Sequence, residues 1–498
     1  MDKEKSIKIY SMKSKMHQIN HIHFIGIGGS GMGGIAKILI CEGYHISGSD
    51  IFPNVITRYL STLGAKIYFN HRSENVNNAN VVVISSAIPF NNPEILSAKK
   101  QNIPIISRAE MLAELMRFRY GIAISGTHGK TTTTSILSSI YIESGLNPTF
   151  ISGGIVKKRN VLANLGDSNY LIAEADESDA SFLHLNPMVA IITNIDLDHM
   201  DTYQGEVENL KKAFVDFLHN LPFYGYAVVC IDNKIIREII PNINRQIITY
   251  GFNEDADFKI DNYVQYGLQS HFNLIIKNQL CLKIILNTPG HHNVLNATAA
   301  IAVCYKEGIH EKYIIDALKN FEGTERRFDC LGIFPTQPIN GNIGNAILID
   351  DYGHHPTEIN EIIQTMRSGW PSRQLIMIFQ PHRYTRTRDL LNDFVAVLSK
   401  VDILLILNVY PAGEKIISGA SSSCLCNLIQ SISKINPILI TENNCIPETL
   451  ALYISGNDII LIQGAGDISQ VALDLAEYKL QPKYKVQSYK LEEQYEQK

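Results

Sequence analysis

Apolar runs of strand length alternate with helix-length stretches along most of the chain. The first series contains "HIHFIGIGG", "YHISGSD", "AKIYF" and "NVVVISSAIP", and ends near the amphipathic segment "RAEMLAELMRFR". A second series opens at "YGIAISGTHGKTTTT", and a third follows "EGTERRF". Strands that alternate with helices are typical of parallel sheets joined by crossover helices. The pattern therefore predicts an α/β protein made of three consecutive α/β units.

The length of 498 residues agrees with about three domains, because one ordinary core does not serve so long a chain. We place the domains at residues 21–119, 120–328 and 329–498, after a polar leader at 1–20 that we expect to be disordered. The segment "HFNLIIKNQLCLKIILN" has two apolar runs around Lys277, Asn278 and Gln279, which predicts a hairpin. The polar segment "SGASSSCLC" predicts a loop that leads into a helix.

Composition and charge narrow the class of protein. The chain is 45% hydrophobic and 19% charged with a net charge of −5, which argues against binding nucleic acid by broad phosphate neutralisation. Its first residues contain no apolar stretch of a signal peptide, and its apolar runs are shorter than the roughly 20 residues of a membrane helix. The eight scattered cysteines lack zinc-site spacing and suit reduced thiols. We expect a soluble cytoplasmic protein that binds no nucleic acid and inserts into no membrane.

A glycine-bracketed loop stands between an apolar run and a helix in "AISGTHGKTTTTS". Backbone N–H groups at such a loop bind polyphosphate, the lysine neutralises the terminal phosphates, and the next hydroxyl suits Mg²⁺. The common phosphate loop has its first glycine where this chain has Ile124, so the motif here is tighter. The alternative is a tight connection without a ligand. The loop and the residues after it are Gly126, Thr127, His128, Gly129, Lys130, Thr131 and Thr132.

Acidic residues follow two later apolar runs, at the ends where open parallel sheets place their ligands. One run is followed by "EADESD", with Glu174, Asp176, Glu177 and Asp179, and the next by "TNIDLDHMD", which contains His199. Carboxylate oxygens are ligands that Mg²⁺ prefers. These clusters therefore predict a magnesium site, and the alternative for the first of them is a solvated acidic loop.

The first apolar run ends in "GIGGSGMGG", which contains the G-x-G-x-x-G pattern as Gly26, Gly28 and Gly31. Asp50 follows at the end of the next run. This is the dinucleotide-binding pattern in its expected context. Taken alone it favours an NAD-dependent oxidoreductase, but a glycine loop at a helix N-terminus recognises the pyrophosphate of any nucleotide diphosphate. NAD and a UDP-sugar both remain open on these residues, and the second phosphate loop favours the UDP-sugar.

Ten motifs in order resemble the Mur ligases, and most closely the branch that adds L-alanine. They are "GIGGSGMGGIA", "SSAIP", "GTHGKTTTT", "EADESD", "TNIDLDHMDTY", "PGHHNVLNA", "ERRFD", "DDYGHHPTEI", "QPHRYTRT" and "QGAGD". The resemblance implies an N-terminal Rossmann-like domain for UDP, a central P-loop-type ATPase domain and a C-terminal Rossmann-like domain. It also implies ATP and Mg²⁺ as cofactors, and UDP-N-acetylmuramate and L-alanine as substrates in peptidoglycan synthesis.

In this family ATP would phosphorylate the lactyl carboxylate of UDP-N-acetylmuramate, and the amine of L-alanine would attack the acyl phosphate. The resemblance assigns Lys130 to the β- and γ-phosphates, and Thr131 with Glu174 to one Mg²⁺. It assigns His199 to a second Mg²⁺, a role that rests on the resemblance because imidazole is not a preferred ligand of this ion. The catalytic residues implied are Lys130, His199, His354 and Arg383.

The resemblance implies two further sets of contacts. Besides the phosphate loop from Gly126 to Thr132, the ATP contacts are Asn293, Asn296, Arg326 and Asp351. The contacts to the UDP-sugar and the amino acid are Gly26, Gly28, Gly29, Gly31, Asp50, Ser85, Ser86, Tyr352, His354, Arg383 and Arg386.

One family feature is missing, and three alternatives stay open. Ligases that add later residues carry a carbamoylated lysine where this chain has Ala213 or Phe214, so we predict no such group here. Within the family, the alternative is a recycling ligase that attaches a whole tripeptide to UDP-N-acetylmuramate. Outside it, the alternatives are the NAD-dependent oxidoreductase and a nucleotide-driven interaction switch without an amino-acid pocket.

Overall fold

The computed structural model describes residues 16, 18–157, 161–277, 280–336 and 344–481. The chain forms two compact units. The first comprises Met1–Val264, His271–Asn287 and Asn293–Glu322, and the second comprises Gln265–Ser270, Thr288–His292 and Gly323–Lys498. Most of the predicted leader, residues 1–15 and 17, lies outside the described residues, whereas Met16 and Ile19 pack against the core of the first unit.

The first unit opens with a five-stranded parallel sheet in the order β3-β2-β1-β4-β5. Its strands are β1 (His21–Ile25), β2 (His45–Ser49), β3 (Lys66–Tyr68), β4 (Val81–Ile84) and β5 (Ile105–Ser107). Its helices are α1 (Ser30–Cys41), α2 (Val55–Thr62), α3 (Pro93–Lys100) and α4 (Arg108–Arg117), with the 3₁₀ turn η2 (Ser73–Val76). The predicted alternation of strand and helix is confirmed for this sheet.

A ten-stranded sheet follows, in the order β15-β14-β13-β12-β11-β10-β6-β9-β7-β8. Its strands are β6 (Tyr120–Ser125), β7 (Thr149–Val156), β8 (Val161–Asn164), β9 (Tyr170–Glu174), β10 (Val189–Ile192), β11 (Tyr226–Cys230), β12 (Gln246–Gly251), β13 (Phe258–Tyr266), β14 (Gln269–Ile276) and β15 (Leu280–Leu286). Strands β14 and β15 are neighbours, which confirms the predicted hairpin, although its turn residues Asn278 and Gln279 lie outside the described residues. The antiparallel pair β7 and β8 was not predicted.

Helices and short 3₁₀ turns connect these strands. The helices are α5 (Lys130–Glu143), α6 (Val207–His219), α7 (Lys234–Ile239), α8 (His291–Lys306) and α9 (Glu311–Lys319). The 3₁₀ turns are η4 (Ser181–His184), η5 (Met200–Tyr203) and η6 (Ile240–Asn242).

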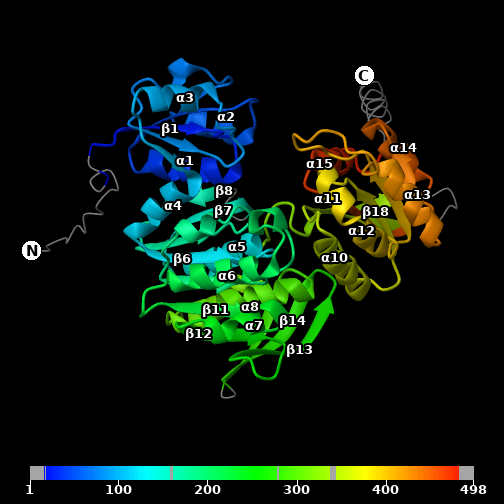
Figure 1. Cartoon of the computed structure of the whole chain (residues 1–498). Helices are drawn as coiled ribbons and strands as arrows, with labels where there is room; N and C mark the ends of the chain where they lie inside the picture. Colours follow the sequence, from blue (N-terminus) through cyan, green and yellow to red (C-terminus); the bar gives the residue numbers. More distant parts are fainter. Residues whose placement is uncertain (1–15, 17, 158–160, 278–279, 337–343, 482–498) are drawn as a thin grey trace, which may run out of the picture. The chain divides into compact units, whose positions relative to one another are not determined.

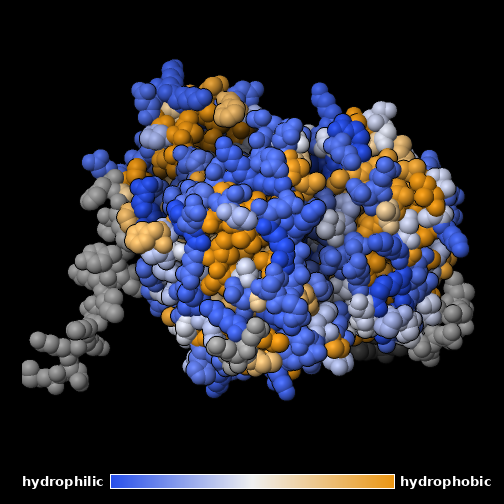
Figure 2. Space-filling view, turned by 60° about the horizontal axis from the view of Figure 1, so that its bottom comes forward, coloured by the Kyte–Doolittle hydropathy of each residue, from blue (hydrophilic) through white to orange (hydrophobic). Residues whose placement is uncertain are grey.

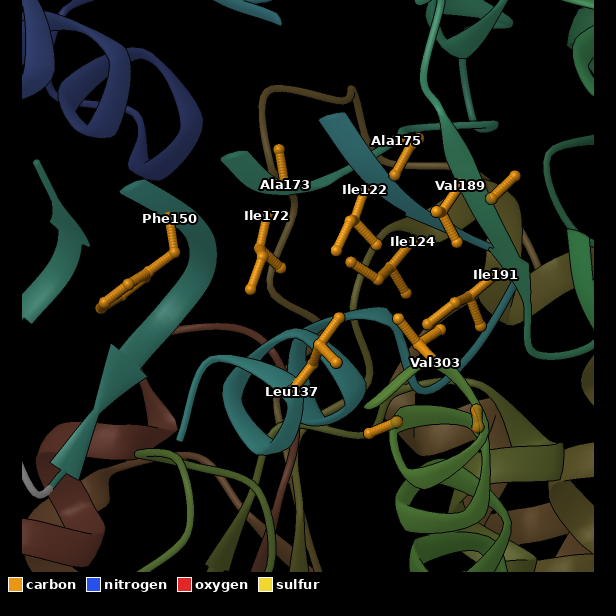
Figure 3. Packing of buried hydrophobic residues seen from close by; sticks show 14 of the residues in the cluster. Ile122, Ile124, Leu137, Phe150, Ile172, Ala173, Ala175, Val189, Ile191 and Val303 are labelled. Carbon is orange, nitrogen blue, oxygen red and sulfur yellow. The ribbon is translucent and has the colours of Figure 1, made fainter. Parts of the chain in front are cut away.

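The core of the ten-stranded sheet explains why its central strands are apolar throughout. All four residues of β10 are buried, because a parallel sheet is covered by helices and loops on both faces. Figure 3 shows Leu137 of α5 and Val303 of α8 pointing towards Ile124 of β6 and Ile191 of β10. This packing fixes the C-terminal end of β6, where the phosphate loop begins.

Helix α1 joins the two sheets of the first unit, and it packs on β7 and β8 (Figure 1). Gly34 allows the close approach, since an added Cβ there would lie 3.0 Å from Ile151 Cγ2. Lys37 of α1 donates to the carbonyl of Ala163 at 2.5 Å, and Arg119 pairs with Glu42 at 2.6 Å. One hydrophobic cluster consequently runs from the small sheet into the large one.

The second unit holds a six-stranded sheet in the order β16-β17-β21-β18-β19-β20. Its strands are β16 (Asp329–Thr336), β17 (Gly344–Asp351), β18 (Gln374–Phe379), β19 (Ile403–Leu407), β20 (Ile438–Ile440) and β21 (Asn457–Gln463). Its helices are α10 (Pro356–Gly369), α11 (Tyr384–Asp389), α12 (Leu391–Leu398), α13 (Ser422–Ile432), α14 (Ile446–Ala451) and α15 (Ile468–Glu477), with the 3₁₀ turn η7 (Asn443–Cys445). Helix α13 begins at Ser422, inside the segment that was predicted to be a loop leading into a helix, whereas the antiparallel edge strand β16 was not predicted.

Three α/β domains in sequence confirm the predicted fold class. The boundaries at 119 and 328 stay predictions. The face drawn in Figure 2 is mostly hydrophilic, with apolar patches between the polar side chains. No helix within the described part of the chain is long and apolar enough to cross a membrane. The eight cysteines all lie in the described ranges, and no disulfide joins any two of them there.

Candidate functional site

The phosphate loop connects β6 to α5, and two of its glycines have backbone angles that other residues avoid. Gly126 has φ +128°, and an added Cβ would lie 2.2 Å from the Thr193 hydroxyl. Gly129 has φ +85°, and its Cβ would lie 2.3 Å from Asn296 Oδ1. Both positions therefore require glycine, for the backbone angle and for the space.

Side chains that follow β10 hold this loop in place. Asn194 accepts from the backbone N–H of His128 at 2.8 Å and donates to its carbonyl at 2.9 Å. The hydroxyl of Thr193 donates to the same carbonyl at 2.6 Å, and Thr127 Oγ1 accepts from the N–H of Asp196 at 2.8 Å. Because β10 lies beside β6, residues that directly follow β10 can reach the loop and hold its path through these bonds.

Lys130 is the first residue of α5, and its ammonium group points back into the loop. Its Nζ donates to the carbonyl of Gly126 at 2.7 Å and to Glu177 Oε2 at 2.8 Å. Burial alone would lower the pKa of Lys130, but Glu177, Asp176 and Glu174 more than offset this and raise it. The lysine therefore stays charged inside a ring of carboxylates and carbonyls.

Thr131 and Glu174 form a pair of oxygen donors beside the lysine. The Thr131 hydroxyl donates to Glu174 Oε2 at 3.2 Å, and the N–H of Gly153 donates to the other carboxylate oxygen. An added Cβ at Gly153 would lie 2.8 Å from Glu174 Oε2, so a larger residue would crowd the carboxylate. The structure thus brings two predicted metal ligands together.

His199 lies after β10, at the start of η5. Its backbone has φ +54°, its N–H donates to Asp198 Oδ1 at 2.8 Å, and its Nε2 lies 3.4 Å from Asp198 Oδ2. The neighbouring carboxylate orients the imidazole. Its predicted role as a metal ligand stays a prediction.

Asn293 and Asn296 lie on the first turns of α8 and are both buried. The amide of Asn296 donates to Asn293 Oδ1 at 3.4 Å, and its own Oδ1 faces Gly129. These two residues were predicted to contact the adenine base. The structure places Asn296 directly against Gly129 of the phosphate loop, and the predicted contact with adenine stays a prediction.

In the first domain, Asp50 holds the glycine-rich loop. Its Oδ2 accepts from the N–H of Gly28 at 2.7 Å, and Asn54 Nδ2 donates to the carbonyl of Gly28 at 3.0 Å. Gly26 turns the chain after β1 with φ +83°, and its N–H donates to the carbonyl of Ser49 at 2.9 Å. The acidic residue of the dinucleotide pattern is thus already bonded within the loop.

A cavity of about 290 Å³ connects the first-domain loop with the phosphate loop. It lies within the first unit, and it brings together residues that the sequence predicted separately for the UDP-sugar and for ATP. The predicted residues in its lining are Gly29, Gly31, Ser85, Ser86, Lys130 and Glu174.

In the second unit, aromatic and basic residues gather at the ends of β17 and β18. The rings of Tyr352 and His354 lie 5.4 Å apart, and those of His354 and His382 lie 5.5 Å apart. Arg386 Nη1 lies 3.5 Å from His382 Nδ1, and the His382 ring stacks on Tyr410 at 5.4 Å. Burial lowers the pKa of His354 to about 3 and that of His382 to about 4, so both imidazoles are neutral near pH 7.

Arg383 immediately precedes α11 and has φ +71°, an uncommon angle for this residue type. Its N–H donates to the carbonyl of Tyr410 at 2.8 Å, and its carbonyl accepts from the hydroxyl of Thr387 at 2.8 Å. These bonds hold the strained backbone, and the side chain itself is exposed.

Arg326 and Asp351 also belong to the second unit, where Arg326 precedes β16 and Asp351 is the last residue of β17. The Arg326 guanidinium donates to the carbonyl of Gly464 at 2.6 Å and lies 5.1 Å from the ring centroid of Tyr352. Asp351 is buried and accepts from the N–H groups of Phe328 and Gly353 and from the amide of Gln463. These bonds make Asp351 an organiser of the loop after β17, and its predicted contact with ATP stays a prediction.

The sequence prediction missed several residues that shape these sites. Thr193 has no motif signature, and only the pairing of β6 with β10 shows that it braces the loop. Glu177 was one of several acidic residues, and the sequence did not single it out as the partner of Lys130. His382 stands in the quoted motif "QPHRYTRT", so its place beside two arginines was a usable signal.

Three family models match the chain in sequence order. The Mur ligase family catalytic domain matches residues 21–120, the Mur ligase middle domain matches 124–304, and the Mur ligase glutamate ligase domain matches 336–466. Their order agrees with the order of the three sheets.

Solved structures of such ligases are similar over most of the chain. The UDP-N-acetylmuramate-alanine ligase of Thermotoga maritima is 26% identical with a TM-score of 0.77, over 92% of this chain and 98% of that one. The murein peptide ligase of Psychrobacter arcticus is 22% identical with a TM-score of 0.67, over 93% and 98%. A UDP-N-acetylmuramate:L-alanyl-gamma-D-glutamyl-meso-diaminopimelate ligase of Neisseria meningitides is 25% identical with a TM-score of 0.57, over 62% and 100%.

The matched family domains span most of the chain, and they leave no separate place for the NAD-dependent oxidoreductase that the first glycine loop alone would favour. Mur ligases use ATP. This chain belongs to the Mur ligase family and is an ADP-forming ligase.

Proposed function

We propose that the protein joins L-alanine to the lactyl carboxylate of UDP-N-acetylmuramate, with ATP as the energy source. The reaction would be the first amino-acid addition to the peptidoglycan precursor. The observation that carries this proposal is the cavity that is lined by both the glycine-rich loop of the first domain and the phosphate loop. The likeness to the alanine ligase of Thermotoga maritima supports the choice of acceptor and amino acid.

The phosphate loop suits the β- and γ-phosphates of ATP. Its N–H groups and the N-terminus of α5 attract anions, and the Lys130 ammonium supplies a full positive charge at the same point. Charge at this position matters because a carboxylate and a triphosphate repel each other, and the attack cannot begin until that charge is neutralised.

The oxygen donors beside Lys130 fit a magnesium ion. Thr131 and Glu174 offer a hydroxyl and a carboxylate 3.2 Å apart, and hard oxygen donors of this kind are the ligands that Mg²⁺ takes. When bound, the ion would neutralise charge that develops on the transferred phosphoryl group. We assign Thr131 and Glu174 to hold it, and His199 to a second such ion on the basis of the family resemblance.

The proposed reaction proceeds in two steps. A lactyl carboxylate oxygen attacks the γ-phosphorus, the bond to the β,γ-bridging oxygen breaks, and ADP leaves. The amine nitrogen of L-alanine then attacks the acyl carbon, the bond to the phosphate oxygen breaks, and phosphate leaves as the amide forms and the amine gives up a proton. Lys130 orients the phosphate chain in the first step and stabilises its growing charge.

We assign the amino acid to the residues of the second unit. Arg383 and Arg386 carry guanidinium groups, which bind a carboxylate in a planar fork. The neutral imidazole of His354 lies near His382 and suits a position beside the incoming amine, where it can accept a hydrogen bond. The ring of Tyr352 lies against the imidazole of His354 and would limit the room for the side chain of the bound amino acid.

A second candidate is the recycling ligase that attaches a preformed tripeptide. The likeness to the tripeptide-related ligase of Neisseria meningitides favours it, at 25% identity. The two candidates share the UDP-sugar, ATP and the acyl phosphate, and they differ only in the amine that attacks.

The test measures phosphate release from ATP and Mg²⁺ with the full chain. UDP-N-acetylmuramate, L-alanine and the tripeptide L-alanyl-γ-D-glutamyl-meso-diaminopimelate are added singly and in pairs, and products are identified by mass. We expect release only with UDP-N-acetylmuramate and L-alanine together, and no release after Mg²⁺ is removed with a chelator.

Release with the tripeptide but not with alanine would replace the proposal by the recycling ligase. Release without either acceptor would favour a nucleotide-driven switch.

A further inference from the structure

Arg108 lies between the two loops of the candidate site, and none of the motifs pointed to it. It is the first residue of α4, directly after β5. A capping box fixes its backbone, with the N–H of Glu110 donating to Ser107 Oγ at 3.1 Å and the N–H of Ser107 donating to Glu110 Oε2 at 2.6 Å. The side chain therefore starts from a rigid point.

The guanidinium reaches the glycine-rich loop of the first domain. An added Cβ at Gly31 would lie 3.1 Å from Arg108 Nη1 and 3.2 Å from its Cδ. Gly31 is the last glycine of the G-x-G-x-x-G pattern and belongs to the first turn of α1. Without a side chain at Gly31, the guanidinium lies beside the N-terminal turn of the helix.

The other end of the guanidinium is held by the central domain. Arg108 Nη2 donates to Asp176 Oδ2 at 3.1 Å, two residues after the end of β9. The other carboxylate oxygen of Asp176 accepts from the N–H of Ser178 at 3.2 Å and from its hydroxyl at 2.7 Å, so the carboxylate is held in place and anchors the arginine. One amino group of the guanidinium, Nη2, is bonded to Asp176, and the other, Nη1, lies beside Gly31.

Arg108 also lines the cavity of about 290 Å³ that contains Lys130 and Glu174. Its side chain is 22% exposed. The cavity thus has two fixed cations, Lys130 at the phosphate loop and Arg108 at the first-domain loop. A substrate with one anionic group near each loop matches this spacing of charge, and a UDP-sugar acid carries a pyrophosphate and a carboxylate.

We propose that Arg108 binds the pyrophosphate of the UDP-sugar substrate, with Asp176 as the residue that positions its guanidinium. The inference rests on the proposed function, because that function supplies the substrate. A planar guanidinium fits phosphate oxygens, and α1 contributes its N-terminal N–H groups from the same side. Arg108 therefore fixes the sugar nucleotide, and Lys130 remains for ATP.

The test compares Arg108→Ala and Arg108→Lys with Arg117→Ala in the full chain. Arg117 is a matched control, because it lies on the same helix and its side chain is 65% exposed in a pair with Glu114. Calorimetry measures binding of UDP-N-acetylmuramate, UDP and ADP, and ligand-observed NMR measures binding of uridine.

We expect Arg108→Ala to weaken binding of UDP-N-acetylmuramate and of UDP by about tenfold or more, as loss of a hydrogen bond to a charged group does. Arg108→Lys should recover part of this loss, because it restores the charge without the fork. Binding of uridine and ADP should change by less than about twofold, and Arg117→Ala should match the wild type.

Equal binding of UDP by the wild type and Arg108→Ala would overturn this inference and leave the proposed function standing. Equal losses for UDP and uridine would also overturn it, since that result means a general loosening of the first domain. A wild type that binds no UDP-N-acetylmuramate would overturn the proposed function, and this inference with it.

Discussion

At the scale of single residues, the candidate site depends on charges that are buried in pairs. Lys130 and Glu177 are only 17% and 5% exposed, and their side chains lie 2.8 Å apart. Removing one partner of a buried ion pair strongly destabilises the folded protein, because the remaining charge has neither water nor an opposite charge beside it. The pair therefore ties the conformation of the phosphate loop to the acidic segment after β9.

Lys130→Met should abolish catalysis and also destabilise the protein. We expect phosphate release to fall by at least about 100-fold through lost charge stabilisation. Unfolding should require about 3 kcal/mol less free energy, because Glu177 is left unpaired. Adding Glu177→Gln should restore much of the stability but none of the activity. Denaturant unfolding and phosphate release measure both effects, and a Lys130→Met protein of wild-type stability would contradict the pairing.

His382 should make the second unit sensitive to acid. Its pKa is lowered to about 4 by burial and by the neighbouring Arg386 and Arg383, whereas in the unfolded chain it is about 6.5. Between these values the unfolded state binds more protons, so stability is lost as the pH falls from about 6.5 to 4. His382→Gln should flatten this dependence in thermal unfolding at several pH values. The exposed His45→Gln serves as the control, and equal slopes for wild type and His382→Gln would refute the prediction.

At the scale of elements, the phosphate loop works as a strand–loop–helix unit braced by a neighbouring strand. β6 supplies a rigid start, α5 supplies the helix N-terminus, and Thr193 and Asn194 after β10 fix the path between them. A loop that is already organised loses less entropy when a nucleotide binds. The conformation of Gly126 is restricted in this loop, since the residue combines a positive φ with a position close to the Thr193 hydroxyl.

Gly126→Ala should damage nucleotide binding more than stability alone explains. The added methyl would lie 2.2 Å from Thr193 Oγ1, so the loop must move. We expect the KM for ATP to rise by about tenfold or more, equivalent to about 1.4 kcal/mol. Gly145→Ala is the matched control, because Gly145 has φ +83° with nothing within 4 Å. It should cost about 1 kcal/mol of stability with an unchanged KM. The same KM change in both variants would show that backbone strain, not the Thr193 contact, is responsible.

At the scale of the whole molecule, the hydrophobic clusters divide between the two units. One large cluster contains Leu137 of α5 and runs through both sheets of the first unit. Two further clusters, one of which contains Leu461 of β21, cover the two faces of the six-stranded sheet. In the described part of the chain, each of these clusters lies within a single unit. The two units should therefore unfold with separate transitions.

Differential scanning calorimetry should resolve more than one transition. Leu137→Ala removes a fully buried side chain of the first unit and should lower one midpoint, and Leu461→Ala should lower the other. Each substitution should cost about 2–5 kcal/mol in its own unit. ADP with Mg²⁺ should raise the transition that Leu137→Ala lowers. A single transition that both variants shift equally would contradict separate cores.

Much of the fold could be predicted from the sequence because it depends on local patterns. Strand-length apolar runs ending in glycine or polar residues predicted β1, β6, β10 and β18 with their helices. The pairs β7–β8 and β16–β17 were not predicted. β16 is an edge strand that contains Gly332 and Pro335 and shows little apolar alternation. Edge strands receive less burial, so their sequences carry a weaker signal.

By itself, the sequence determined the α/β class, the phosphate loop with Lys130, the acidic segment with Glu174, and the glycine loop of the first domain. These features are short, and each follows from backbone angles and residue types within a few positions. The tertiary structure alone decided that Glu177 pairs with Lys130, that Asn296 lies against Gly129, and that Arg108 lies beside Gly31. Such contacts join segments that are distant in the sequence. They depend on which strands lie next to each other in the sheets, and periodicity along the chain does not encode that spatial order.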